Sequence, residues 1–145
     1  MKHTPEGHLF TEVVLEVFKL SGSLVAEGDK ITSDHGLSSA RWKILGAIAR
    51  SEALITVPQI ARSMGLTRQA VQRLVEAMLT DGLLDLLTNP NHKRAKLVVL
   101  SDKGKKVYSA IMEDQIPWAN NSGALLDKKD LETTLSTLKK LTQQF

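Results

Sequence analysis

The sequence predicts a mainly α-helical fold that carries one small β-hairpin. Apolar residues recur at helical spacing over most of the 145 residues, and two short apolar runs flank an Asn- and Pro-rich loop near residue 90. Residues 56–82 have the pattern of two short helices joined by a tight turn. A chain of this length with 42% apolar residues suits one compact domain, residues 1–145, with helical extensions.

The composition argues against several classes of protein. Cysteine is absent, which excludes disulfides, thiolate metal sites and cysteine-based redox sensing. The first residues contain no apolar signal core, and later apolar runs are too short to span a bilayer, so we expect a cytoplasmic protein. The sequence has no Gly-rich phosphate loop, no nucleophile motif and no clustered acidic site, since Asp81 and Asp85 flank a turn and are expected to stay hydrated. We therefore expect no enzyme and no cofactor.

The chain begins with the pattern of a long helix. Thr4 is its expected N-cap and Pro5 its first residue. Apolar residues come in pairs from Leu9 to Val25 and form a wide stripe on a helix of roughly 20 residues, which Gly28 is expected to end before a polar loop, residues 29–36. An ordinary core helix has such a stripe, but its breadth in so small a domain favours a helix shared between two subunits.

A second helix is expected from residue 39, capped by Ser38 or Ser39. Within it, Trp42 is expected to fill the core or an interface rather than to contact a ligand. Residues 54–56 are expected to form a short strand that leads into the next helix.

Residues 56–82 form the stretch around which the chain is organised. Thr56 and Gln59 have the spacing of a capping box, and Gly65 is expected to end the first short helix. Thr67 is expected to cap a second helix, residues 67–81, which Gly82 closes. Its apolar positions share one face and leave a polar face outside, formed by Arg68, Gln69, Gln72, Arg73 and Glu76. Such a helix-turn-helix fits a DNA major groove, although the polar face of an ordinary helical hairpin meets only water.

A β-hairpin follows the second helix. The apolar runs at residues 83–87 and 96–100 flank a loop, and the loop and return strand concentrate His92, Lys93, Arg94 and Lys96. A basic hairpin next to such a helix is a wing, which can reach the DNA backbone or minor groove. A solvated loop or a lid would carry similar charges.

The C-terminal part is predicted to be helical. Ser101 is the expected cap of one helix, with Asp102 near the positive end of its dipole, and Pro117 is expected to bend or end that helix. Asp127 is expected to cap the last helix, whose leucines from Leu131 onward recur at heptad-like spacing.

The net charge of +3 hides an uneven distribution. Residues 41–106 hold 12 basic and 5 acidic side chains, whereas the rest of the chain holds 7 basic and 11 acidic ones. A basic middle between acidic ends is expected of a phosphate-facing module on a separate helical frame.

The order of these elements resembles the MarR (multiple antibiotic resistance regulator) family of winged helix-turn-helix transcription factors along nearly the whole chain. The most specific pieces are residues 37–45, residues 66–75 and residues 100–104. The resemblance implies a homodimer, with residues 4–36 and 102–145 as dimerisation helices and residues 37–101 as the winged helix-turn-helix DNA-binding lobe. It also implies a ligand-responsive cleft between the two parts. One departure concerns the wing, where the family's Asp-x-Arg is replaced by His92 and Arg94, so the orienting aspartate is missing.

The sequence therefore predicts a DNA-binding transcriptional regulator, a ligand-responsive homodimeric repressor of a pseudo-palindromic operator. Helix 67–81 would lie in the major groove and the wing, residues 84–100, on the backbone or minor groove. The residues expected to meet base edges are Arg68, Gln69, Gln72 and Arg73. Those expected on phosphates or in the minor groove are Ser38, Gln59, Arg62, Lys93, Arg94 and Lys96, and Thr67 and His92 complete the DNA-binding set. His35 and Trp42 are the candidates for effector binding.

The alternative is a metal- or small-molecule-sensing helical protein-interaction module that does not read DNA. A metal site has little support, because His3, His8, His35 and His92 are scattered and lack ligand spacing. Salt-sensitive binding to random duplex DNA would distinguish the two hypotheses.

Overall fold

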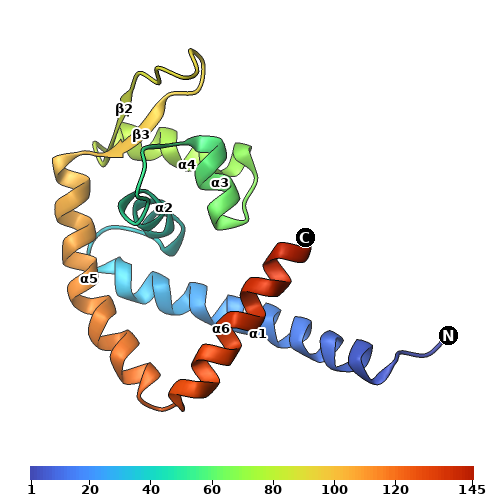
Figure 1. The fold of residues 1–145 in the computed structure, drawn as a ribbon. Coiled ribbons are helices and arrows are strands. Elements are labelled where there is room, and N and C mark those ends of the chain that lie inside the picture. The colour runs from blue at the N-terminus through green and yellow to red at the C-terminus, as the bar shows by residue number, and fades with distance from the viewer.

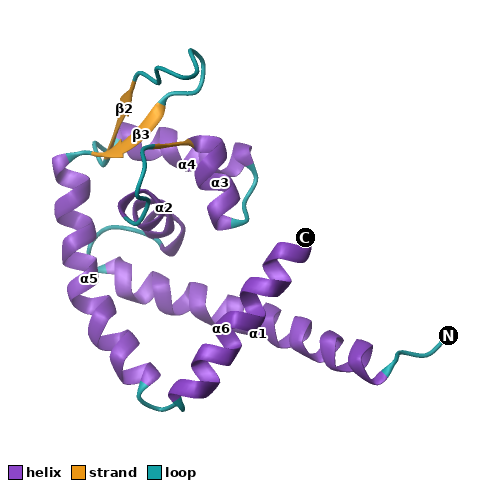
Figure 2. Ribbon diagram, viewed as in Figure 1, coloured by secondary structure: helices purple, strands orange, loops and turns teal.

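The computed structural model describes all 145 residues and contains six helices and three short strands (Figures 1 and 2). The elements follow the chain in the order α1 (Pro5–Ser33), α2 (Ser39–Ala49), β1 (Ile55–Thr56), α3 (Val57–Met64), α4 (Arg68–Thr80), β2 (Leu84–Leu87), β3 (Leu97–Leu100), α5 (Asp102–Gly123) and α6 (Lys128–Gln144). The mainly helical fold with a small β-hairpin is thus confirmed. No helix is both long enough and apolar enough to cross a membrane.

The three strands form one antiparallel sheet in the order β1-β3-β2. In the hairpin, Leu84 pairs with Leu100 and Leu87 with Leu97, and β1 adds to the other edge of β3 by pairing Ile55 with Val98. The loop between β2 and β3 extends away from the rest of the molecule (Figure 1). Both the predicted hairpin and the predicted short strand before α3 are confirmed.

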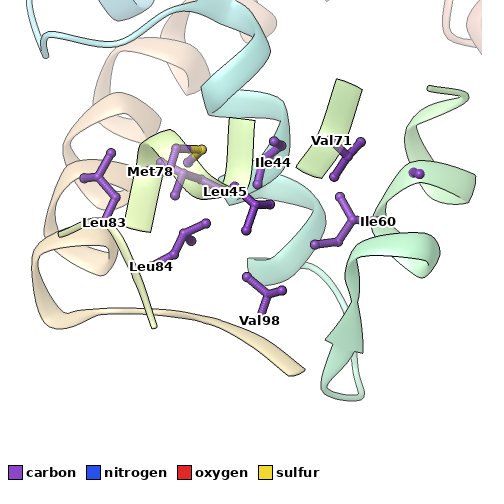
Figure 3. Close-up of a cluster of buried hydrophobic side chains, with 10 residues drawn as sticks. Ile44, Leu45, Ile60, Val71, Met78, Leu83, Leu84 and Val98 are labelled. Atoms are coloured by element: carbon purple, nitrogen blue, oxygen red, sulfur yellow. The ribbon is translucent and has the colours of Figure 1, made fainter. Parts of the chain in front are cut away.

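The hydrophobic core lies among α2, α3, α4 and the sheet (Figure 3). Ile44, Leu45, Ile60, Val71 and Met78 are all 0% exposed there. Every member of this cluster lies between residues 44 and 98, so the core belongs to the middle of the chain. It holds the helix-turn-helix and the base of the wing as one packed unit.

The predicted helix starts are confirmed by their hydrogen bonds. Thr67 Oγ1 accepts from the backbone N–H of Ala70 at 3.1 Å, and Ser101 Oγ accepts from that of Gly104 at 3.0 Å. Thr4 and Asp127 cap α1 and α6 in the same way. Of the two serines considered for α2, Ser38 is the cap. Such caps satisfy N–H groups that have no partner within the helix.

The prediction that the first helix ends at Gly28 is wrong, because α1 continues to Ser33. Gly28 is buried against α2, where a Cβ atom would lie 2.6 Å from Ser39 Oγ. The glycine therefore allows a close helix crossing rather than a helix end. Asp29, expected in a loop, lies in the helix and accepts the backbone N–H of Ser39 at 2.8 Å.

Pro117 does not end its helix. α5 runs six residues beyond it to Gly123, and the helix changes direction along its length (Figure 1). Proline removes one backbone hydrogen bond, the one that the carbonyl of Glu113 would accept. Glu113 is exposed, so water can satisfy that carbonyl.

The apolar stripes of α1 and α6 are exposed. Only Gly28 and Thr32 of α1 are buried, and no residue of α6 is buried. Phe18 is 70% exposed, and Leu135 on α6 is 54% exposed. α1 extends away from the packed middle of the chain to the N-terminus, whereas α6 begins at the far end of α5 and runs back across α1 in this view (Figure 1).

Candidate nucleic-acid interface

The polar face of α4 points outward. Val71, Val75 and Met78 turn the other face of the helix into the core, where each is at most 1% exposed. Arg68, Gln69, Gln72 and Arg73 are all exposed. Burial of one apolar stripe thus fixes the direction in which the long polar side chains project.

A concave groove of about 730 Å³ separates this face of α4 from the wing. Seven of the twelve predicted DNA-binding residues line it: Arg68, Gln69, Gln72 and Arg73 from α4, and His92, Arg94 and Lys96 from the wing. The groove has no acidic residue in its lining. A concave surface that combines amide groups with guanidinium and ammonium groups suits a polyanion with readable edges.

His92 organises the tip of the wing. Its Nδ1 atom accepts the backbone N–H groups of Ala95 at 3.0 Å and Arg94 at 3.3 Å. A ring nitrogen that accepts carries no proton, so these two bonds require the ring hydrogen to lie on Nε2. An aspartate carboxylate at this position could accept the same two bonds. The His92 ring therefore provides the acceptor that the missing aspartate would have provided, and Arg94 still lines the groove.

Asn89 is a structural residue of the wing that the sequence reasoning missed. Its Nδ2 donates to the carbonyl of Ala95 at 3.0 Å, and its Oδ1 accepts the N–H of Asn91 at 3.0 Å. The second bond is an Asx-type turn, which an Asn before a proline indicates in a loop. Asn89 and His92 together close the loop beyond the last paired residues of the hairpin.

The other five predicted DNA-binding residues lie outside this groove. Ser38, Gln59 and Thr67 each have a bond at the start of a helix; Gln59 Oε1, for example, accepts the N–H of Thr56 at 2.9 Å. Arg62 and Lys93 are exposed and form no ion pair. Helix starts present N–H groups, and free cations attract phosphate, so all five remain chemically suited to a backbone contact.

A second cavity, of about 840 Å³, lies among α2, α3 and α5. Trp42 lines it, together with Tyr108 and Met112 of α5. His35 does not line it, and its Nε2 atom lies 2.8 Å from Oδ2 of Asp114 on α5. The cations Lys43 and Arg50, which the sequence reasoning did not single out, also belong to its lining. The spacing of Lys43 and Arg50 in the sequence does not indicate a cavity, because the cavity forms only where α5, a distant part of the chain, packs near α2.

Metal-ligating side chains do not gather anywhere in the structure. No group of three or more His, Asp or Glu side chains is close enough to hold a metal ion. His35 has one carboxylate neighbour, Asp114, and no third His, Asp or Glu side chain joins this pair to form a metal site.

The comparisons with known proteins agree with this geometry. The MarR family model matches residues 35–95, which hold α2, the helix-turn-helix and most of the wing. A crystal structure of a MarR/EmrR family transcriptional regulator from Acinetobacter has a TM-score of 0.83 over 94% of this chain and 96% of that one, at 18% identity. The chain belongs to the MarR family. It has the winged helix-turn-helix fold of that family's DNA-binding transcriptional regulators.

Three further proteins are similar to this MarR family member. An uncharacterised protein of Mycobacterium tuberculosis is 36% identical over 129 residues, which make up 89% of each chain. The transcriptional activatory protein BadR of Rhodopseudomonas palustris is 23% identical over 110 residues, 74% of this chain and 63% of that protein. The structure of CouR from Rhodococcus jostii, bound to p-coumaroyl-CoA, has a TM-score of 0.80 at 15% identity and covers 90% of this chain and 91% of CouR.

Proposed function

We propose that this MarR family member is a ligand-responsive homodimeric repressor that binds a pseudo-palindromic operator. The helix α4 lies in the major groove and the wing lies on the backbone or in the minor groove. One observation carries the proposal: the outward face of α4 and the basic wing line a single groove that contains no carboxylate. No catalytic activity, metal or cofactor forms part of the proposal.

The chemistry of the groove matches the two parts of DNA recognition. Gln69 and Gln72 offer the paired donor and acceptor that fit adenine, and the guanidinium of Arg73 fits the acceptors of guanine. Arg94, held at the wing by His92, suits the negative potential of a narrow minor groove. Contacts to base edges would determine which DNA sequence is bound, and contacts from the wing would fix the position of the protein along the duplex.

The exposed stripes of α1 and α6 support a homodimer. Their apolar side chains, such as Phe18 at 70% exposure, have no partner within the chain. Exposed apolar surface of this extent marks an interface in soluble proteins. A two-fold axis through these helices would present two α4 helices to half-sites about 34–36 Å apart, one turn of DNA.

The cavity beside Trp42 supports the response to a ligand. Its volume, about 840 Å³, lies within the range of small-molecule sites. Trp42 and Tyr108 offer aromatic faces, while Lys43 and Arg50 favour an anion. A ligand that prefers one arrangement of α5 against α2 and α3 would shift the population of DNA-binding dimers. CouR, whose crystal structure was solved with p-coumaroyl-CoA bound, shares this fold.

Repression is the simplest direction of regulation, because a dimer on an operator within a promoter occupies the DNA that polymerase needs. A relative, BadR, is named as an activator, so the direction depends on where the operator lies. A reporter gene under the native upstream region would rise when the protein is deleted if it represses, and would fall if it activates.

The test of direct DNA binding is its dependence on salt. Arg94→Ala should weaken binding to every duplex, random sequence included, and should reduce the salt slope by about 1, because one phosphate-facing cation is lost. Lys139→Ala, an exposed change on α6, is the matched control and should leave both quantities unchanged. A protein-docking module need not bind random duplex DNA in this salt-sensitive way. An unchanged slope for Arg94→Ala would remove the wing from the interface.

A further inference from the structure

The end of α4 is fastened to the start of α5 through three consecutive carbonyl groups. The carbonyl of Asp81 accepts Lys103 Nζ at 2.8 Å, and that of Gly82 accepts Ser101 Oγ at 2.5 Å. The carbonyl of Leu83 accepts the backbone N–H of Ser101 at 3.1 Å. The carbonyls at the end of α4 and in the turn after it thus meet donors from the N-cap and the first turn of α5, as orphan groups at a helix end require.

The backbones at this junction are in direct contact. Gly104 is buried in the first turn of α5, and a Cβ atom there would overlap the carbonyl oxygen of Leu83. A side chain at residue 104 would push α5 away from the end of α4. The glycine is therefore required by close approach, and the two elements cannot slide past each other without breaking several bonds together.

A third element holds the same corner. Asp81, the C-cap of α4, pairs through Oδ2 with Arg41 Nη1 of α2 at 2.5 Å. A carboxylate at a helix C-terminus is opposed by the helix dipole, so helix formation alone does not favour aspartate here. Arg41 and Lys103 supply the two compensating cations, one on the carboxylate and one on the carbonyl. The junction formed by Arg41, Asp81, Ser101, Lys103 and Gly104 is called the α4–α5 clamp below.

We infer that the α4–α5 clamp is the joint that fixes the recognition helix relative to the dimer helices, and that Arg41 and Lys103 are positioning residues for DNA binding. The inference rests on the proposed function, because it requires two copies of α4 on one duplex. From the clamp, α5 runs past the cavity residues Tyr108 and Met112 toward α6. A displacement of α5 at the cavity therefore reaches α4 through the clamp, one turn away.

A rigid joint has a measurable consequence for spacing. Moving two half-sites apart by one base pair shifts them by ~3.4 Å along the duplex and rotates them about its axis. A dimer with stiff joints loses affinity on such DNA. A dimer with loosened joints tolerates it, because α4 can follow the displaced groove.

The first experiment measures the joint without DNA. The chain has no cysteine, so a single Glu76→Cys change places one spin label on each α4 of the dimer. Pulsed dipolar spectroscopy should give a narrow distance distribution in the otherwise unchanged protein and a broader one with Lys103→Met or Arg41→Met. Lys105→Met is the control, because Lys105 lies on the same turn, is exposed and has no side-chain bond. Lys103→Arg keeps a cationic donor and should restore the narrow distribution.

The second experiment measures spacing on the operator recovered by selection from random DNA. One base pair inserted between the half-sites should cost the unchanged protein and Lys105→Met about tenfold in affinity, and Lys103→Met and Arg41→Met about threefold or less. Affinity for random duplex should be the same in all variants. Thermal unfolding of each variant shows whether it remains folded.

The outcomes separate the clamp from the proposed function. Equal distance distributions and equal spacing profiles in all folded variants would overturn the role of the clamp. So would a Lys103→Met variant that loses affinity equally on operator and random duplex, because Lys103 would then be a phosphate contact. An absence of any dipolar distance, together with selected DNA that lacks paired half-sites, would overturn the dimer proposal and the clamp with it.

Discussion

The winged helix-turn-helix lobe, residues 37–101, and the two terminal helices differ in how their apolar residues are used. In the lobe, residues such as Ile44, Ile60 and Met78 are fully buried in one cluster. In α1 and α6, equally regular apolar positions such as Phe18 and Leu135 stay exposed. A helical repeat of apolar residues shows that a face will be buried, but not whether the covering surface belongs to the same chain. The core of the lobe is complete within one chain, whereas the apolar faces of α1 and α6 are left uncovered in it.

The largest effect is expected from opening the core of the lobe. Ile60→Ala removes a side chain that is 0% exposed in the core cluster and should lower the free energy of unfolding by about 2–5 kcal/mol. Chemical denaturation followed by circular dichroism measures this loss. The loss should not depend on protein concentration, because the cavity lies inside one subunit. A change below about 0.5 kcal/mol would contradict the packing in Figure 3.

An effect of a different kind is expected on α1. Phe18→Gln removes a large apolar side chain from the exposed stripe and should weaken subunit association by about 1.5–3 kcal/mol per buried side chain. Sedimentation velocity at several concentrations measures the shift toward monomer, and hydrogen exchange should show unchanged protection of the lobe core. Lys19→Gln, an exposed neighbour on the same helix, is the control. If the oligomeric state did not change, the stripe would need another covering surface.

A smaller effect is expected at the wing. His92→Ala removes the acceptor of two backbone N–H groups and should weaken operator binding by about 0.5–1.5 kcal/mol per bond that is not replaced by water. His92→Asp and His92→Asn each provide an oxygen acceptor and should retain most of the affinity. Fluorescence anisotropy with labelled operator measures the series. Equal affinities for the alanine and aspartate variants would show that the ring does not position Arg94.

The comparison also explains which features the sequence could predict. Short-range patterns predicted the caps at Thr67 and Ser101, the turn at Gly65 and the hairpin, because each depends on residues a few positions apart. The outward face of α4 followed from the periodicity of Val71, Val75 and Met78.

The features that the sequence could not predict depend on contacts between distant segments. The sequence around Gly28 indicates a helix end, and only the packing of Ser39 against this glycine explains why it lies inside a helix. Asp81 was expected to stay hydrated but pairs with Arg41, 40 residues earlier. The role of His92 depends on the path of the wing backbone, which places two N–H groups at Nδ1. The spacing of residues along the chain does not indicate any of these three contacts.

The central claim is that α4 and its copy in a second subunit read one duplex. Selection of bound fragments from a pool of random double-stranded DNA tests this claim most directly. The account predicts an inverted repeat whose half-sites have centres about 10–10.5 base pairs apart, with adenine and guanine at the contacted positions. Recovery of a single unrepeated site, or of no sequence preference at all, would contradict it.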